Sequence, residues 1–225
     1  SNCQKAYICR IVEILKGTRM KKGDALEIIK STHTFRNLPE DLIEILVRSA
    51  KNEHYDQECL LHRNSQPWDN LYFVISGFIQ ARQRTVTGLE TSAIPVQKGV
   101  WVSWSAVFPI PFTNPLSAEI WVSKNAHLLT VPCEQIRHVA REWPQLYIQI
   151  IEEINYLFYL THELVWSNNL LSGIKKVGRA LLYQNAVSAF KDSATIMVTQ
   201  ERLAQTLNIS RQTLSLHLQE LQQKK

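Results

Sequence analysis

The chain has 225 residues with a formal net charge of +5, and 45% of its residues are hydrophobic. This composition can build a folded core and excludes an intrinsically disordered chain. No apolar run approaches the roughly 20 residues of a membrane span, and no secretory leader is visible. The four cysteines are scattered without C-x-x-C spacing, which indicates idle thiols and no metal site. We therefore expect a cytoplasmic protein without a membrane partner.

The first third of the chain begins with helical patterns. Residues 1–34 are expected to form a helical extension, with helices over 6–16 and near 24–30. Pro39 then opens a helix that runs through Ala50 and carries its apolar residues on one face.

Short strands dominate the next segment, from about residue 52 to residue 131. Gly and turn residues separate them, and Pro109, Pro111 and Pro115 predict a loop over residues 109–115. Many short strands at this spacing predict an antiparallel barrel or sandwich. The expected strands cover residues 58–62, 70–75, 77–82, 91–96, 100–102, 118–122 and 126–131.

A long helix is predicted over residues 144–171, after a short helix over 132–143. Its apolar residues follow a heptad repeat, which is typical of a two-stranded coiled coil. The polar Asn168 would fix the register of such a dimer. The alternative is a helix packed on its own domain. The expected seam consists of Tyr147, Ile150, Ile154, Leu157, Thr161, Leu164, Asn168 and Leu171.

The last quarter of the chain predicts two short helices joined by a tight turn. A helix over 173–190 and a short strand over 195–198 precede them. Thr199 and Ser210 are N-cap residues for helices over 199–207 and 210–222. Asn208 lies between them and tolerates a left-handed backbone. The inward-facing residues are expected to be Leu203, Ala204, Leu207, Ile209, Leu214, Leu218 and Leu221.

Polar side chains face outward from the second of these helices. Arg211, Gln212 and Ser215 occupy the positions from which a helix-turn-helix reads bases in the major groove. Residues 173–225 hold eight basic and three acidic side chains, so the whole net charge of +5 resides there. This combination predicts a DNA-binding unit.

A barrel, a long helix and a helix-turn-helix in this order resemble the Crp/Fnr family of bacterial transcription regulators. The segment 71–80, LYFVISGFIQ, is similar to the family's strand-Gly-strand element, and 97–101, QKGVW, to the turn before its effector loop. The segment 177–182, VGRALL, resembles the start of its DNA-binding domain. The segments 199–205, TQERLAQ, and 208–214, NISRQTL, are most similar to its helix-turn-helix.

The resemblance implies an α+β fold with three parts after the N-terminal extension. These are a jelly-roll barrel of the cyclic-nucleotide-binding type over 35–143, a dimerisation helix over 144–172 and a winged-helix-type helix-turn-helix over 173–225. Family members continue into a β-hairpin wing, whereas this sequence stops at Lys225. The implied partners are double-stranded DNA, a second copy of the chain and RNA polymerase.

The resemblance also implies roles for individual residues. Arg211 would read guanine, and Gln212 replaces the family's usual Glu, which moves the preference away from cytosine. Leu216 replaces a second arginine. The DNA-binding residues are expected to be Thr199, Gln200, Ser210, Arg211, Gln212, Thr213 and Ser215.

The effector site departs from the pattern of the cyclic-nucleotide-binding members. Ser103-Trp104-Ser105 replaces their Gly-Glu-Leu step, and Leu116-Ser117 replaces their Arg-Ser step. A buried phosphate would then lack its cationic partner, which is strongly unfavourable. Thr161 falls where cyclic-AMP members contact the base. We expect no response to cyclic AMP.

The aromatic residues of this region leave two readings open. Trp101, Trp104, Phe108, Phe112 and Trp121 either fill the barrel interior or line a site for an uncharged apolar effector. No cofactor is expected, because the cysteines do not match the family's iron–sulfur pattern and a lone histidine is weak evidence for haem.

Two other classes of function compete with a DNA-binding regulator. One is a ligand- or partner-sensing module whose helix-turn-helix is degenerate and no longer binds DNA. The other is an enzyme, which is not expected because the sequence has no phosphate loop, no paired nucleophile and base, and no metal-ligand spacing.

Overall fold

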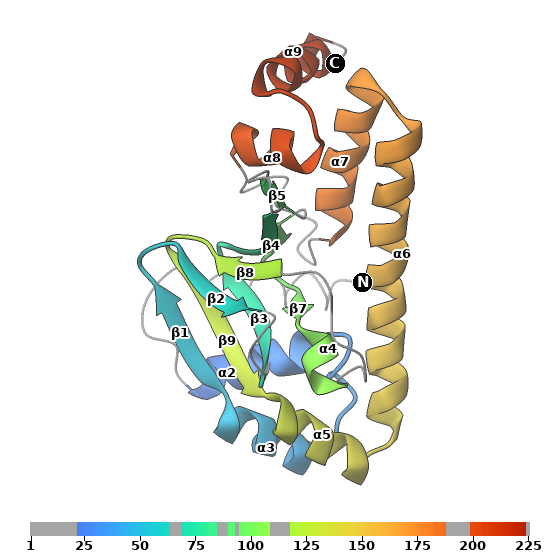
Figure 1. Ribbon diagram of the computed structural model, residues 1–225. Helices are drawn as coiled ribbons and strands as arrows, with labels where there is room; N and C mark the ends of the chain where they lie inside the picture. The colour runs from blue at the N-terminus through green and yellow to red at the C-terminus, as the bar shows by residue number, and fades with distance from the viewer. Residues whose placement is uncertain are drawn as a thin grey trace.

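The computed structural model describes residues 22–63, 69–84, 90–92, 95–108, 118–187 and 199–223. The first helices are α2 (Lys22–Ser31), α3 (Glu40–Ser49) and α4 (Trp104–Val107), and they are followed by α5 (Cys133–Glu142), α6 (Gln145–Leu170), α7 (Gly173–Val187), α8 (Gln200–Thr206) and α9 (Arg211–Gln223) (Figure 1). The strands are β1 (Lys51–Tyr55), β2 (Cys59–Arg63), β3 (Asn70–Ser76), β4 (Phe78–Arg84), β5 (Glu90–Ser92), β6 (Val96–Gln97), β7 (Trp101–Val102), β8 (Ala118–Val122) and β9 (Ala126–Pro132).

The strands form two antiparallel sheets. One has the order β1-β9-β3-β7, and the other has the order β2-β8-β4-β5 with β6 paired to β4. The predicted strands over 70–75, 118–122 and 126–131 are confirmed within a residue or two. The sequence does not predict strand β1, because its residues KNEHY show no apolar alternation. In the structure it is an edge strand that pairs antiparallel with β9.

The alternation of side chains along β3 divides the apolar residues between two cores. Tyr72 and Val74 face the second sheet, where they pack with Ile79, Val122 and Leu128. The intervening residues of β3 face the opposite way, as the two-residue period of a strand requires. There they pack beneath α2, α3, α5 and α6. The β1-β9-β3-β7 sheet is therefore covered on both faces.

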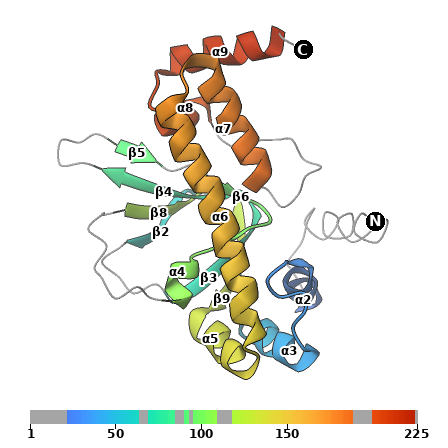
Figure 2. The ribbon, with the colours of Figure 1, turned by 90° about the vertical axis from the view of Figure 1, so that its right-hand side faces the viewer.

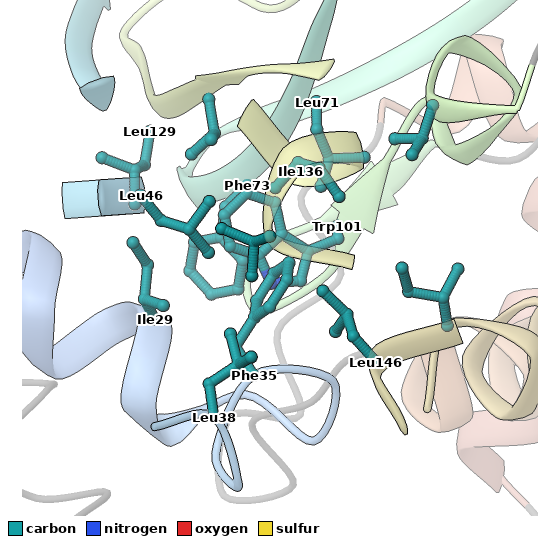
Figure 3. Packing of buried hydrophobic residues seen from close by; sticks show 14 of the residues in the cluster. Ile29, Phe35, Leu38, Leu46, Leu71, Phe73, Trp101, Leu129, Ile136 and Leu146 are labelled. Atoms are coloured by element: carbon teal, nitrogen blue, oxygen red, sulfur yellow. The ribbon is translucent and has the colours of Figure 1, made fainter. Parts of the chain in front are cut away.

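Trp101 occupies the helix-covered core and not the space between the sheets. It is 1% exposed and meets Phe35 edge to face, with the ring centroids 5.3 Å apart (Figure 3). Trp101 lies opposite Phe73 in the β3–β7 register, which places both side chains on the same face. Trp104 packs against Phe35 as well, at 6.2 Å. The prediction that these two tryptophans occupy the barrel interior is wrong.

Helix α2 contributes directly to this larger core. Ala25, Ile28 and Ile29 are buried in it together with Phe35. Residues 22–34 therefore pack with the sheets, and the boundary expected at residue 35 runs through one continuous core. The helix expected over residues 6–16 lies outside the described residues.

Gly77 allows the tight connection between β3 and β4. Its φ is +76°, and a Cβ atom there would lie 2.6 Å from Ser123 Oγ and 2.7 Å from Ala126 Cβ. Ser123 Oγ accepts a hydrogen bond from the Phe78 amide at 3.0 Å. The strand-Gly-strand segment therefore needs glycine for both conformation and space.

Helix α6 runs along most of the molecule and links the sheets to a third core (Figures 1 and 2). That smaller core joins Val177 and Ala180 of α7 to residues of α8 and α9. None of the helices in the described part of the chain is long and apolar enough to cross a membrane.

Candidate nucleic-acid interface

Helices α8 and α9 begin at the two predicted N-caps. The Thr199 hydroxyl accepts a hydrogen bond from the Arg202 amide at 3.3 Å, and the Ser210 hydroxyl accepts one from the Thr213 amide at 3.0 Å. Asn208 lies in the turn with φ at +52°, the left-handed conformation expected from the sequence. Local side-chain chemistry thus sets the start of each helix and the turn between them.

The predicted inward face of this helix pair is confirmed. Ala204 is 3% exposed at the crossing of α8 and α9, and Leu207 and Leu214 are fully buried. A small residue at the crossing lets two helices approach closely. The remaining members of this face, Leu203, Ile209, Leu218 and Leu221, belong to the same core.

The opposite face of α9 is open to solvent at its N-terminal end. Arg211 and Gln212 are exposed, and Thr213 and Ser215 are half-buried. Leu216, which follows on the same exposed side, is 65% exposed. In Figure 1, α9 lies at the end of the molecule farthest from α3 and α5.

Two arginines of this unit form ion pairs with the rest of the chain. Arg179 of α7 donates to Glu163 of α6 at 2.6 Å. Arg202 of α8 forms an ion pair with Glu58, in the turn between β1 and β2. The positive charge of residues 173–225 is thus partly balanced by carboxylates from the earlier part of the chain.

The predicted dimer seam largely faces the chain itself. Ile150 has no exposed surface and belongs to the larger core, which Tyr147, Ile154 and Leu157 also contact. Thr161 is exposed, and its hydroxyl donates to the Leu157 carbonyl at 2.8 Å. Leu171 follows the last residue of α6. Assigning Ile150 to a contact with a second chain is therefore wrong, because its own core covers it completely.

A different stripe of α6 is exposed. Its residues follow the same heptad spacing as the predicted seam, with every position shifted by one residue towards the C-terminus. Its apolar members Ile148, Ile151, Phe158 and Val165 are each more than half exposed. The polar residues Asn155, His162 and Asn169 complete the repeat, and all three are exposed. Tyr159 and Trp166 flank the stripe at 62% and 54% exposure. We refer to these nine residues as the α6 stripe, which lies on a helix in the foreground of Figure 2.

Among the residues expected to line an effector site, those that the structure describes do not gather between the sheets. Ser103 is half-buried, with φ at +85°, immediately before α4. The Thr161 hydroxyl lies 3.4 Å from Tyr183 Oη of α7, which directs it toward that helix. Trp121 lies on the outer face of its sheet, where the Arg82 guanidinium stacks 4.7 Å from its ring centroid. Leu116, Ser117 and Phe112 lie outside the described residues.

Glu153 is a half-buried carboxylate on α6. Its partial burial raises the pKa of the carboxyl group to about 7. Glu153 follows exposed Glu152 in the sequence, and no local pattern distinguishes the two. The tertiary burial of Glu153 is what makes its carboxyl group hard to ionise.

Comparison with solved structures shows a shared fold along most of the chain. FixK2 from Bradyrhizobium japonicum matches with a TM-score of 0.63 at 12% identity, over 78% of this chain and 85% of that one. CLP from Xanthomonas campestris, a c-di-GMP responsive global regulator, matches with a TM-score of 0.60 at 17% identity, over 83% and 93%. A regulator from Eubacterium rectale assigned to the crp/fnr family matches with a TM-score of 0.52 at 18% identity, over 86% and 88%.

These likenesses show the overall α+β architecture that the Crp/Fnr resemblance implies. The protein is an α+β chain with antiparallel sheets and helices arranged as in full-length Crp/Fnr proteins. No protein-family model and no curated protein matches the sequence.

Proposed function

We propose that this chain is a sequence-specific DNA-binding transcription regulator of the Crp/Fnr type that acts as a homodimer. The observation that carries the proposal is the α8–α9 pair, in which two capped helices cross at Ala204 and leave Arg211 and Gln212 exposed at the start of α9. That arrangement supports a helix-turn-helix, a motif whose second helix enters the major groove.

In the proposed complex, some side chains would contact DNA bases and others would contact phosphates. Arg211 would donate to N7 and O6 of guanine, and Gln212 would favour adenine. Thr199, Gln200, Ser210 and Thr213 lie at the N-terminal ends of α8 and α9, where backbone amides and the helix dipole favour phosphate. Ser215, half-buried on α9, would make a weaker contact with a base or a phosphate.

The homodimer would form through the α6 stripe. Long exposed runs of apolar side chains on a helix are unusual for a monomer and mark association surfaces. A heptad repeat favours a two-stranded coiled coil, and the polar residues within it would set the register. Leu164 and Asn168 stay predicted members of the dimer seam.

The proposed regulator does not use cyclic AMP. Trp104 takes the place of the family's ribose-binding Glu, and its ring packs on Phe35 under the helices. An apolar effector remains a proposed partner because of the aromatic residues in the sequence, and RNA polymerase because of the family resemblance. The named regulators with this fold give no support to an enzymatic function.

A second candidate function is a sensing module whose helix-turn-helix no longer binds DNA. The ion pairs of Arg179 and Arg202 favour it, because two cations that could contact phosphate already have carboxylate partners. The exposed Leu216 also adds no polar group to the face of α9 that would contact the bases.

A salt titration of duplex binding distinguishes the two candidates. If the helix pair binds DNA, the logarithm of the binding constant should fall linearly with the logarithm of salt concentration, with a slope of about −0.9 for each phosphate contacted. Fluorescence anisotropy of a labelled random duplex measures it. Absence of binding at about 50 mM salt would support the sensing module.

A further inference from the structure

The outer face of the β2-β8-β4-β5 sheet holds the α8–α9 unit through one cluster of side chains. Arg202 of α8 forms an ion pair with Glu58, donates to Gln80 Oε1 at 3.3 Å, and lies 5.6 Å from the Phe78 ring centroid. Helix α8 also packs beside β5, as Figure 1 shows. We call Glu58, Phe78, Gln80, Arg82 and Arg202 the interdomain cluster.

Glu58 is bound from two sides. Arg82 of β4 donates to it at 3.0 Å and forms an ion pair at 2.8 Å. Arg82 in turn stacks on Trp121, which fixes its position in the sheet. Glu58 is therefore anchored on the sheet by one arginine and holds the α8–α9 unit by the other.

The cluster is shielded from solvent more than a typical surface ion pair. The side chains of Arg82, Arg202 and Glu58 are 13%, 21% and 33% exposed. The exposed pair Arg48–Glu44 on α3 leaves 73% and 56% of its side chains exposed. Screening by salt weakens with burial, so the cluster holds the unit more firmly than a pair such as Arg48–Glu44.

We propose that Glu58 acts as an intramolecular competitor of DNA phosphate for Arg202, so that the interdomain cluster holds the α8–α9 unit in a resting state. The proposal rests on the proposed DNA-binding function. Arg202 lies one helical turn after Thr199, at the end of α8 where phosphate would bind. A guanidinium engaged by a carboxylate cannot also engage a phosphate at full strength, so DNA binding and docking on the sheet oppose each other.

Two variants break the same contact with opposite consequences for DNA. Glu58→Gln releases Arg202 with its charge intact, so binding of a random duplex is expected to tighten about three- to fivefold, as for loss of one competing ion pair. Arg202→Gln also undocks the unit but removes the cation, so binding is expected to weaken. Glu44→Gln is the control, because it changes the net charge equally and lies on α3.

Hydrogen exchange provides a readout that does not depend on DNA. Amide exchange in α8 and in the β1–β2 turn is expected to rise in both Glu58→Gln and Arg202→Gln, and to stay unchanged in Glu44→Gln. Unchanged exchange in the first two variants overturns the proposal. So does equal tightening of DNA binding by Glu58→Gln and Glu44→Gln, which would indicate a general charge effect.

Failure of the competition and failure of the DNA-binding function give different experimental results. Raised exchange without any duplex binding by any variant would refute the DNA-binding function and leave the docking contact established. Duplex binding that Glu58→Gln does not alter would refute the competition and leave the DNA-binding function standing.

Discussion

At the scale of single residues, the place of a side chain in the first turn of α8 or α9 decides what it can contact. Thr199 and Ser210 each have a backbone amide partner in the following turn. Those caps leave the start of α9 regular and its first outward side chains free to face a partner. Arg211 is exposed there, whereas Arg202 faces the sheet.

Replacing Arg211 with Ala tests its proposed base contact. We expect a loss of about 1–3 kcal/mol in binding to the preferred site and relaxed specificity at one base position. Measurement of affinity for a set of single-base variants of the site checks this. The control is Lys175→Ala, which removes an exposed cation of α7 and should weaken all sequences alike. Equal behaviour of both variants would contradict base reading by Arg211.

Glu153 predicts a dependence of stability on pH. Its pKa is raised to about 7, so the folded chain holds a proton between pH 4.5 and 7 that the unfolded chain has released. Stability should therefore fall as pH rises through this window, by on the order of 3 kcal/mol for a shift of this size. Glu153→Gln should remove this contribution, which raises stability more at pH 8 than at pH 5.

Denaturant unfolding at pH 5 and pH 8 measures this effect. Glu152→Gln is the matched control, because the Glu152 side chain is 57% exposed and pairs with His33 at the surface. An equal response of the two variants to pH would show that Glu153 is not held in a poorly solvated site.

At the scale of elements, the sequence predicts the helix pair α8–α9. It does not predict which face of each strand or long helix packs against the rest of the chain. Caps, turn and apolar spacing in residues 199–222 are local, and the structure keeps all three. The two-residue period of β3 could also be predicted from the sequence. Which of its two faces packs against helices could not, because α2, α3, α5 and α6 come from distant parts of the chain. Trp101 and Trp104 were assigned to the wrong side of the sheet for this reason.

The seam of α6 shows the same limit in a helix. Its apolar residues are abundant enough to satisfy two heptad registers, displaced by one residue. Packing of Ile150, Ile154 and Leu157 in and against the larger core uses one register and leaves the other exposed. The sequence predicts an amphipathic long helix, but only tertiary contacts decide which face is left for a partner.

Substitution in the α6 stripe tests the proposed dimer. Phe158→Asp should weaken dimerisation at least tenfold, about 1.4 kcal/mol, because it would bury an unpaired carboxylate in an apolar contact. Sedimentation equilibrium measures the effect. Leu182→Asp on α7 is the control, because Leu182 is exposed to a similar extent, 63% against 67%, and lies outside the stripe. Dissociation by both variants, or a monomeric wild-type chain, would contradict the proposed interface.

At the scale of the whole molecule, contacts distant in sequence connect the sheets to the α8–α9 unit. Arg202 and Glu58 are 144 positions apart, and neither residue belongs to a motif that marks the pairing in advance. The order of sheets, long helix and helix pair could be predicted because each element has its own pattern. The docking between them depends on side chains that meet only after the elements have folded.

Acid should release this docking. Hydrogen bonding from Arg82 and Arg202 lowers the pKa of Glu58 below 4.5, although burial opposes the shift. Because the folded pKa is depressed, the contribution of the pair is complete above pH 4.5 and lost as pH falls through the folded value. Protection of the α8 amides, measured relative to the intrinsic exchange rate at each pH, is expected to fall below pH 4.5 in the wild-type chain. The same change should be absent in Glu58→Gln, which starts undocked.

The most direct measurement is in vitro selection of random duplex DNA by the full chain with no ligand added. The account predicts enrichment of a near-palindromic site with half-sites about one helical turn, 34–36 Å, apart, since two α9 helices of a dimer would enter successive major grooves. A site with a single unpaired half-site would contradict the dimer. No enrichment at low salt would contradict DNA binding by this chain alone and favour the sensing module.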